Sequence, residues 1–111
     1  MSDNVIEIDA SRYEAEVLKS AVPVVLDFYS TECPPCEALA PKFESVAEAY
    51  AGRAKFIKVF RQGNRELAQK LGVSGSPTLV FFKNGAEVGE RMSGEEIKKT
   101  AIKAQVEALV G

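Results

Sequence analysis

Histidine and tryptophan are both absent from this chain of 111 residues, and cysteine occurs only twice. The absence of histidine excludes Ser-His-Asp and Cys-His catalytic sites, together with every metal site that needs an imidazole ligand. Lysine and arginine number 14 against 16 acidic residues, and no stretch of the sequence is strongly basic. Because nucleic-acid binding relies on clustered positive charge, we expect no nucleic-acid partner.

Long hydrophobic runs are also missing. The longest, such as 22–26 and 78–82, are far shorter than the ~20 apolar residues that a membrane-spanning helix needs. The first residues, Met-Ser-Asp-Asn, lack the basic and apolar segments of a secretory signal. These absences predict a cytoplasmic protein with no membrane partner. The length and the absence of linkers or repeats predict a single domain, 1–111, which we expect to be a monomer.

The chain does contain a regular alternation of strand and helix signals. Helices are predicted at about 34–50 and 65–71, and strands at about 5–8, 22–30, 55–60, 78–83 and 86–92. Asn84-Gly85 is a hairpin signal between the last two strands. The order βαβαβαββα predicts an α/β fold with a mixed five-stranded sheet and helices on both faces.

Two further helices are predicted from their starts. Ser11 with Glu14, and Ser93 with Glu96, have the spacing of a capping box, in which each side chain bonds to the backbone N–H of the other residue. We therefore expect one helix to begin at Ser11 and the last helix to begin at Ser93.

The two cysteines, Cys33 and Cys36, lie between a predicted buried strand and the predicted start of a helix. The first turn of a helix offers unpaired N–H groups and partial positive charge, which favour a thiolate. A loop from strand to helix is also exposed, so a substrate disulfide can reach it. Because the pair can close an intramolecular disulfide, it can form a mixed disulfide and then resolve it. We predict Cys33, nearer to the helix end and the outside, as the nucleophile and Cys36 as the resolving thiol.

The sequence is less compatible with other roles for the cysteine pair. A static disulfide would close a tiny loop and stabilise little. Zinc normally takes a full tetrahedral set of ligands, whereas one chain offers two sulfurs and no imidazole. A metal or iron–sulfur cluster shared by two chains, and a binding module whose cysteines take no part, stay open as alternatives. The redox interpretation is favoured because Cys-x-x-Cys beside a βαβ pattern is typical of it, and it needs no metal and no cofactor beyond the pair.

Asp27 is the one acid within an otherwise apolar strand. Burial raises the pKa of a carboxyl group, which makes it a suitable proton acceptor near neutral pH. The alternative is a surface position at a sheet edge, which the apolar neighbours at 24–28 disfavour.

Several segments together stand in the order and spacing of the thioredoxin family: Asp27-Phe-Tyr-Ser-Thr-Glu-Cys-Pro-Pro-Cys36, Pro41, Gly75-Ser-Pro-Thr-Leu79, Phe82-Lys-Asn-Gly85 and Gly94. The chain resembles this family over nearly its whole length. The resemblance implies a protein-disulfide reductase that accepts electrons from a flavoprotein reductase and passes them to protein disulfides. A glutaredoxin-like or isomerase-like role is the close alternative, since Cys-Pro-x-Cys is a glutaredoxin-style spacing.

The resemblance also implies roles for single residues. Asp27 would assist deprotonation of the second cysteine, with Lys58 close to the acid; the alternative for Lys58 is a solvated strand lysine. Pro77 would be cis and face the disulfide, rather than being an ordinary loop proline. The backbone of Ser76 would pair with an extended substrate segment.

Four more residues are predicted to bind substrate. Gly75 and Gly94 match loop glycines that let a partner chain approach the sulfurs, or else they are turn residues that need an unusual φ. Pro34 and Pro35, between the two cysteines, complete the set.

The sequence departs from the family at the site itself. Thioredoxins typically read Trp-Cys-Gly-Pro-Cys-Lys, whereas this chain has Glu32 and Glu37 on either side of the pair and Pro34 in place of glycine. The glutamates place negative charge beside the nucleophile, which disfavours its thiolate. Phe60 and Arg61 stand where the family is usually acidic. These departures predict a shift in the choice of partner.

Overall fold

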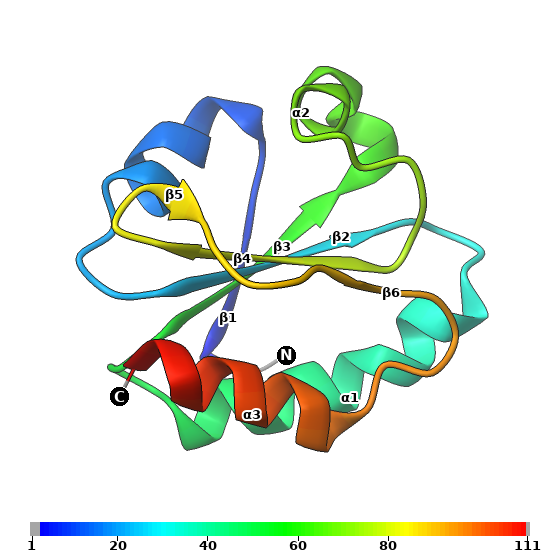
Figure 1. Ribbon diagram of the computed structural model, residues 1–111. Coiled ribbons are helices and arrows are strands. Elements are labelled where there is room, and N and C mark those ends of the chain that lie inside the picture. Colours follow the sequence, from blue (N-terminus) through cyan, green and yellow to red (C-terminus); the bar gives the residue numbers. More distant parts are fainter. Residues whose placement is uncertain (1–2, 111) are drawn as a thin grey trace.

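A mixed β-sheet forms the centre of the molecule, and the computed structural model describes residues 3–110 (Figure 1). Its strands lie in the order β1-β3-β2-β4-β5, and β6 also pairs with β4. β1 and β2 are parallel to β3, whereas β4 is antiparallel to β2. The predicted mixed sheet is therefore confirmed. The strands are β1 (Val5–Ile8), β2 (Val24–Tyr29), β3 (Lys55–Phe60), β4 (Thr78–Lys83), β5 (Ala86–Glu87) and β6 (Met92–Ser93).

Helices cover both faces of this sheet, as predicted. α1 (Pro34–Ala49) and α3 (Lys99–Val110) lie together on one face, and α2 (Arg65–Lys70) and the helical turns near the N-terminus lie on the other (Figure 1). Each face has its own apolar core. Leu39, Phe43 and Val46 of α1 pack with Ile102 and Val106 of α3 in the first core. Among residues 3–110, no helix has the length and apolar character needed to cross a membrane.

The central strands β2 and β4 are buried on both faces, which explains their continuous apolar sequences. Asp27 interrupts the apolar sequence of β2, yet only 3% of its surface is exposed. The sheet therefore holds a carboxyl group inside its most buried strand, directly before the loop that carries the cysteines.

Both capping-box predictions are wrong. Asp9, not Ser11, caps the first helical segment, because its carboxylate accepts the Ser11 N–H at 2.9 Å. The segment is a 3₁₀ turn at Ala10–Arg12 followed by a π-helical turn at Glu14–Leu18. Glu14 instead forms an exposed ion pair with Lys19.

The last helix begins at Lys99 and not at Ser93, because Ser93 is held in the sheet opposite Thr78. The predicted strand at 86–92 is also divided. In the register of β5, Leu79 would face Glu90, but it faces Met92 of β6 instead. Gly89, whose φ is +70°, lies in the break between β5 and β6. The edge strand thus bulges outward before it rejoins β4.

The hairpin at Asn84-Gly85 is confirmed, with φ angles of 54° and 81°. Both values are left-handed, as a tight two-residue hairpin turn requires. A Cβ at Gly85 would lie 2.9 Å from the carbonyl oxygen of Leu18, so only glycine fits there without a shift of the backbone.

Candidate active site

Cys33 and Cys36 are joined by a disulfide at the N-terminus of α1. Cys33 is the N-cap residue, and its Sγ accepts the backbone N–H of Cys36 at 3.2 Å. Pro34 and Pro35 occupy the first helical positions, where a missing backbone N–H removes no helical hydrogen bond. Once the disulfide is reduced, this N–H and the helix terminus would both favour a thiolate at Cys33.

The two sulfurs have different surroundings. Each cysteine is 8% exposed, so exposure does not place Cys33 further outside than Cys36, contrary to our expectation. The Sγ of Cys33 lies 3.7 Å from the carbonyl oxygen of Ser76, on the loop before β4. Cys36 instead borders a cavity that reaches Asp27 and Lys58. The two sulfurs are therefore distinguished by what each one faces.

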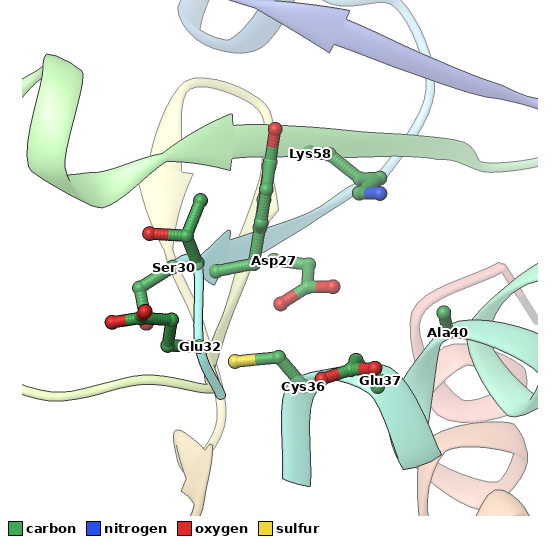
Figure 2. Close-up of a pocket in the computed structure, with 9 residues that line it drawn as sticks. Asp27, Ser30, Glu32, Cys36, Glu37, Ala40 and Lys58 are labelled. Atoms are coloured by element: carbon green, nitrogen blue, oxygen red, sulfur yellow. The ribbon is translucent and has the colours of Figure 1, made fainter. Parts of the chain in front are cut away.

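The cavity beside Cys36 has a volume of about 320 Å³ (Figure 2). Asp27 and Lys58 are register partners on the parallel strands β2 and β3, so both side chains reach this cavity. In Figure 2 the carboxyl group of Asp27 lies between the Lys58 side chain and Cys36. The remaining lining residues are Tyr29, Ser30, Thr31, Glu32, Glu37 and Ala40.

Asp27 has the electrostatics of a proton acceptor. Burial raises the pKa of its carboxyl group to about 7, and the positive charge of Lys58 opposes that rise without cancelling it. Its Oδ1 is buried and has no hydrogen-bond partner among residues 3–110. A buried oxygen with an unused lone pair beside Cys36 can take a proton near neutral pH.

Lys58 is half-buried rather than fully solvated. Its Nζ lies 4.5 Å from the ring centroid of Tyr29, a cation–π distance. The hydroxyl of Tyr29 in turn donates to Glu7 at 2.6 Å. Within residues 3–110, no ion pair at 4.0 Å or less joins Lys58 to Asp27. Lys58 therefore acts on the carboxyl group through space.

The sequence analysis did not identify Tyr29, whose ring makes the cation–π contact with Lys58. Tyr29 follows Asp27 by two positions in β2, so the two side chains share one face of the sheet. That spacing is the signal that could have identified it.

The loop before β4 forms the other wall of the site. The Ser76–Pro77 peptide bond is cis, as the resemblance implies. Gly75, Ser76, Pro77 and Gly94 all line one groove of about 390 Å³, so the structure brings these predicted residues together. Pro34 and Pro35 border neither this groove nor the cavity beside Cys36.

The two glycines of this groove differ in backbone conformation. Gly94 has a φ of +94°, in the left-handed region, whereas Gly75 does not. A Cβ added at either position would meet no atom within 4 Å. The space above both is therefore open to a partner chain.

Arg61 and Gln62 connect the two walls of the site. They belong to the short turn η3 (Arg61–Gly63) that follows β3. The Nε of Arg61 donates to the hydroxyl of Ser76 at 2.8 Å. The side-chain oxygen of Gln62 accepts the N–H of Thr31 at 3.0 Å and its hydroxyl at 3.1 Å. The turn η3 is therefore hydrogen-bonded both to the loop that carries the cysteines and to the loop that carries Pro77. No pattern in the sequence identified Gln62.

Within residues 3–110, no three histidine, cysteine, aspartate or glutamate side chains lie together as a metal site requires. The cluster shared by two chains stays a hypothesis, which metal analysis of the purified protein would test.

Comparison with known proteins adds independent evidence. A sequence model of the thioredoxin family matches residues 4–108. The thioredoxin of Peptoclostridium acidaminophilum is 34% identical over 111 residues, which cover 100% of both chains. Thioredoxin 1 of Nostoc is 38% identical over 82 residues, 74% of this chain and 77% of that protein. The crystal structure of Malassezia sympodialis thioredoxin (Mala s 13) matches with a TM-score of 0.83 and 29% identity, over 96% of this chain and 91% of that one.

Proposed function

This chain belongs to the thioredoxin family, whose members are protein-disulfide reductases. We propose that Cys33 attacks the substrate disulfide and that Cys36 then resolves the mixed disulfide. The observation that supports this assignment is the asymmetry of the disulfide. Cys33 lies against Ser76 on the loop before β4, which we call the substrate loop, whereas Cys36 borders the cavity that Asp27 also lines.

The proposed reaction has two exchange steps. In the reduced protein, the Cys33 thiolate attacks one sulfur of the substrate disulfide, forms a mixed disulfide and displaces the other substrate sulfur as a thiolate. The thiol of Cys36 then loses its proton and attacks Cys33. This second step restores the Cys33–Cys36 disulfide and releases the remaining substrate thiolate. Two electrons pass from the cysteine pair to the substrate, whose two thiolates take up protons.

Asp27 is the proposed acceptor of the Cys36 proton. Its pKa of about 7 lets it hold or release a proton near neutral pH, and it lines the same cavity as Cys36. The charge of Lys58 lowers the pKa of Asp27, so Lys58 tunes this acceptor.

The proposed substrate site is the groove of the Pro77 loop. The open space above Gly75 and Gly94 admits an extended segment, and the backbone of Ser76 would pair with it. The exposed Pro34 and the half-buried Pro35 would contact the same segment from the side of α1.

The proposed partners are protein disulfides and a flavoprotein reductase of the thioredoxin-reductase kind, which restores the dithiol. No cofactor beyond the cysteine pair is needed for either exchange step. Because a dithiol must be kept reduced to act as a reductant, we propose a cytoplasmic location, with the single domain 1–111 acting as a monomer. Recycling by thioredoxin reductase rather than by glutathione would separate this role from a glutaredoxin-like one.

The test is the reduction of insulin by dithiothreitol, followed with wild type, Cys33→Ser and no protein. We expect wild type to accelerate the reaction and Cys33→Ser to fall to the rate without protein. Circular dichroism of the variant controls for folding. Equal rates for wild type, Cys33→Ser and no protein would favour a binding module instead, whereas full activity in Cys33→Ser would contradict the assignment of Cys33 as the nucleophile.

A further inference from the structure

A second groove lies beside the substrate loop, between η3, α2 and the start of the loop after α2. Its volume is about 460 Å³. Arg61 and Arg65 supply its charge, and none of its lining residues is acidic. The other lining residues are Gln62, Ala68, Gln69, Val73 and Ser74.

The two arginines of this groove have no anionic partner. Arg12 and Arg91 each form an ion pair with a glutamate four positions away. Among residues 3–110, no acidic side chain lies within 4.0 Å of Arg61 or Arg65. The Nε of Arg65 donates to the carbonyl oxygen of Gln62, at 3.3 Å. Arg61 is half-buried, so its charge has lost part of its hydration without gaining a counter-charge. A bound carboxylate would supply that counter-charge.

Arg61 is also close to the reacting sulfur. Its Nε bonds to the hydroxyl of Ser76, and the carbonyl oxygen of that same residue lies 3.7 Å from the Sγ of Cys33. Only Nε is used in this bond, so the remaining N–H groups of the guanidinium are available for a carboxylate.

The opposite side of the disulfide carries the opposite charge. Glu32 and Glu37 border the cavity of Cys36 and are both exposed. A substrate acid would be repelled from that side and attracted to the side of Arg61, which fixes the direction in which the segment lies.

We propose that Arg61 and Arg65 bind a carboxylate side chain of the substrate, so that this protein prefers disulfides flanked by aspartate or glutamate. In an extended segment, residues two positions apart point to the same face. The acid therefore belongs two positions from the reacting cysteine, where its side chain faces this protein. The inference rests on the proposed function, since it names the substrates of that same site.

The test uses three symmetrical peptide disulfides, each made of two copies of one peptide joined through its single cysteine. The residues two positions before and after the cysteine are both Asp, both Asn or both Lys. Reduced wild type is mixed with each peptide, and the second-order rate constant is divided by that of the same peptide with dithiothreitol. This division removes the effect of the flanking charge on the peptide's own reactivity.

We expect wild type to reduce the Asp peptide about five- to tenfold faster than the Asn peptide, and the Lys peptide more slowly still. The net charge of −2 of the whole protein would give the reverse order, so a preference for Asp must be local. High salt should reduce the ratio. Arg61→Gln and Arg65→Gln should each bring it towards one.

Arg53→Gln is the matched control. It removes the same charge, but Arg53 precedes β3 and Arg61 follows it, so the two lie about 20 Å apart at opposite ends of the strand. The preference should survive in this variant.

Three outcomes would overturn the inference while the proposed function stands. They are equal normalised rates for all peptides, a preference that persists in both groove variants, and an Arg61→Gln variant that slows all three peptides equally. The last would show that Arg61 serves only to position Ser76. Failure of wild type to reduce any peptide would instead contradict the proposed function.

Discussion

The two sides of the Cys33–Cys36 disulfide hold charge in different ways. On the side of Cys36, apart from the exposed Glu32 and Glu37, the charge belongs to Asp27, which is 3% exposed in the most buried strand of the sheet. On the side of Cys33, it belongs to Arg61 and Arg65, which stand on a turn and a short helix at the surface. The first is fixed by packing of the whole core, whereas the second depends on side chains that few other residues constrain.

In the proposed function, this difference separates the group that transfers a proton from the groups that bind substrate. A proton acceptor needs a shifted pKa, and only burial in the sheet provides one here. A docking groove needs accessible charge, which a surface turn provides and which sequence change alters at little cost to stability. The contrast explains why Asp27 matches the thioredoxin family while Arg61 departs from it.

The largest expected effect concerns how the stability of the protein depends on pH through the buried carboxyl group of Asp27. In the folded protein Asp27 keeps its proton up to about pH 7, whereas an unperturbed aspartate loses it near 3.8. The folded state therefore binds more protons between these values, so the free energy of unfolding falls as pH rises through this window, by up to about 4 kcal/mol. Asp27→Asn carries no such charge and should lack this fall. Denaturant unfolding of the oxidised proteins at pH 4 and pH 8 measures the difference.

Lys58→Met supplies the control for that measurement. Removing the positive charge raises the pKa of Asp27 further, so the fall in stability should extend to higher pH than in wild type. An unchanged pH dependence in Asp27→Asn would show that the carboxyl group is not the cause.

A smaller effect is expected at η3, the turn that connects the loop of the cysteines to the loop before β4. Gln62→Ala removes both hydrogen bonds to Thr31 and should cost about 1 kcal/mol of stability. It should also lower kcat/KM for the Asp, Asn and Lys peptides by the same factor, because the cysteine loop is loosened while Arg61 keeps its charge. Asn64→Ala is the matched control, because it loses two hydrogen bonds beside the same turn, one donated to the carbonyl oxygen of Phe60 and one accepted from the backbone N–H of Ala10. A change in the charge preference of Gln62→Ala would place Gln62 among the groups that bind the acid.

The smallest effect concerns surface charge on the two sides. Glu32→Gln removes a negative charge near Cys33, and Arg61→Gln removes a positive one. The first should speed alkylation of reduced Cys33 at pH 7 about twofold and the second should slow it by a similar factor, because solvent screens exposed charges. Iodoacetamide kinetics on the Cys36→Ser background isolates this thiol. Shifts of the same sign would mean that the two sides do not oppose each other at the sulfur.

Much of this architecture could be predicted from the sequence. The apolar runs of β2 and β4 are long and continuous, and they identify both the buried strands and the burial of Asp27. The starts of α1 and α2 were predicted correctly. The starts placed at Ser11 and Ser93 were wrong, because a serine with a glutamate three positions later is equally compatible with a sheet edge, as at Ser93.

The missed parts of the site are side chains whose role depends on tertiary contacts. A glutamine in a surface turn has no distinctive pattern, and only the fold brings Gln62 against Thr31. Arg61 was identified as a departure from the family, but its contact with Ser76 across 15 positions could not be read from local sequence. Tyr29 shares a face with Asp27, yet its contact with Lys58 needs the register of two parallel strands.

The central claim is that the two cysteines have different roles, and trapping of the mixed disulfide tests it most directly. Reduced Cys36→Ser and reduced Cys33→Ser are each mixed with the Asn peptide disulfide, and the adducts are identified by mass spectrometry under non-reducing conditions. We predict that Cys36→Ser accumulates an adduct through Cys33, whereas Cys33→Ser forms little in the same time. Faster or equal accumulation through Cys36 would contradict the assignment of Cys33 as the nucleophile.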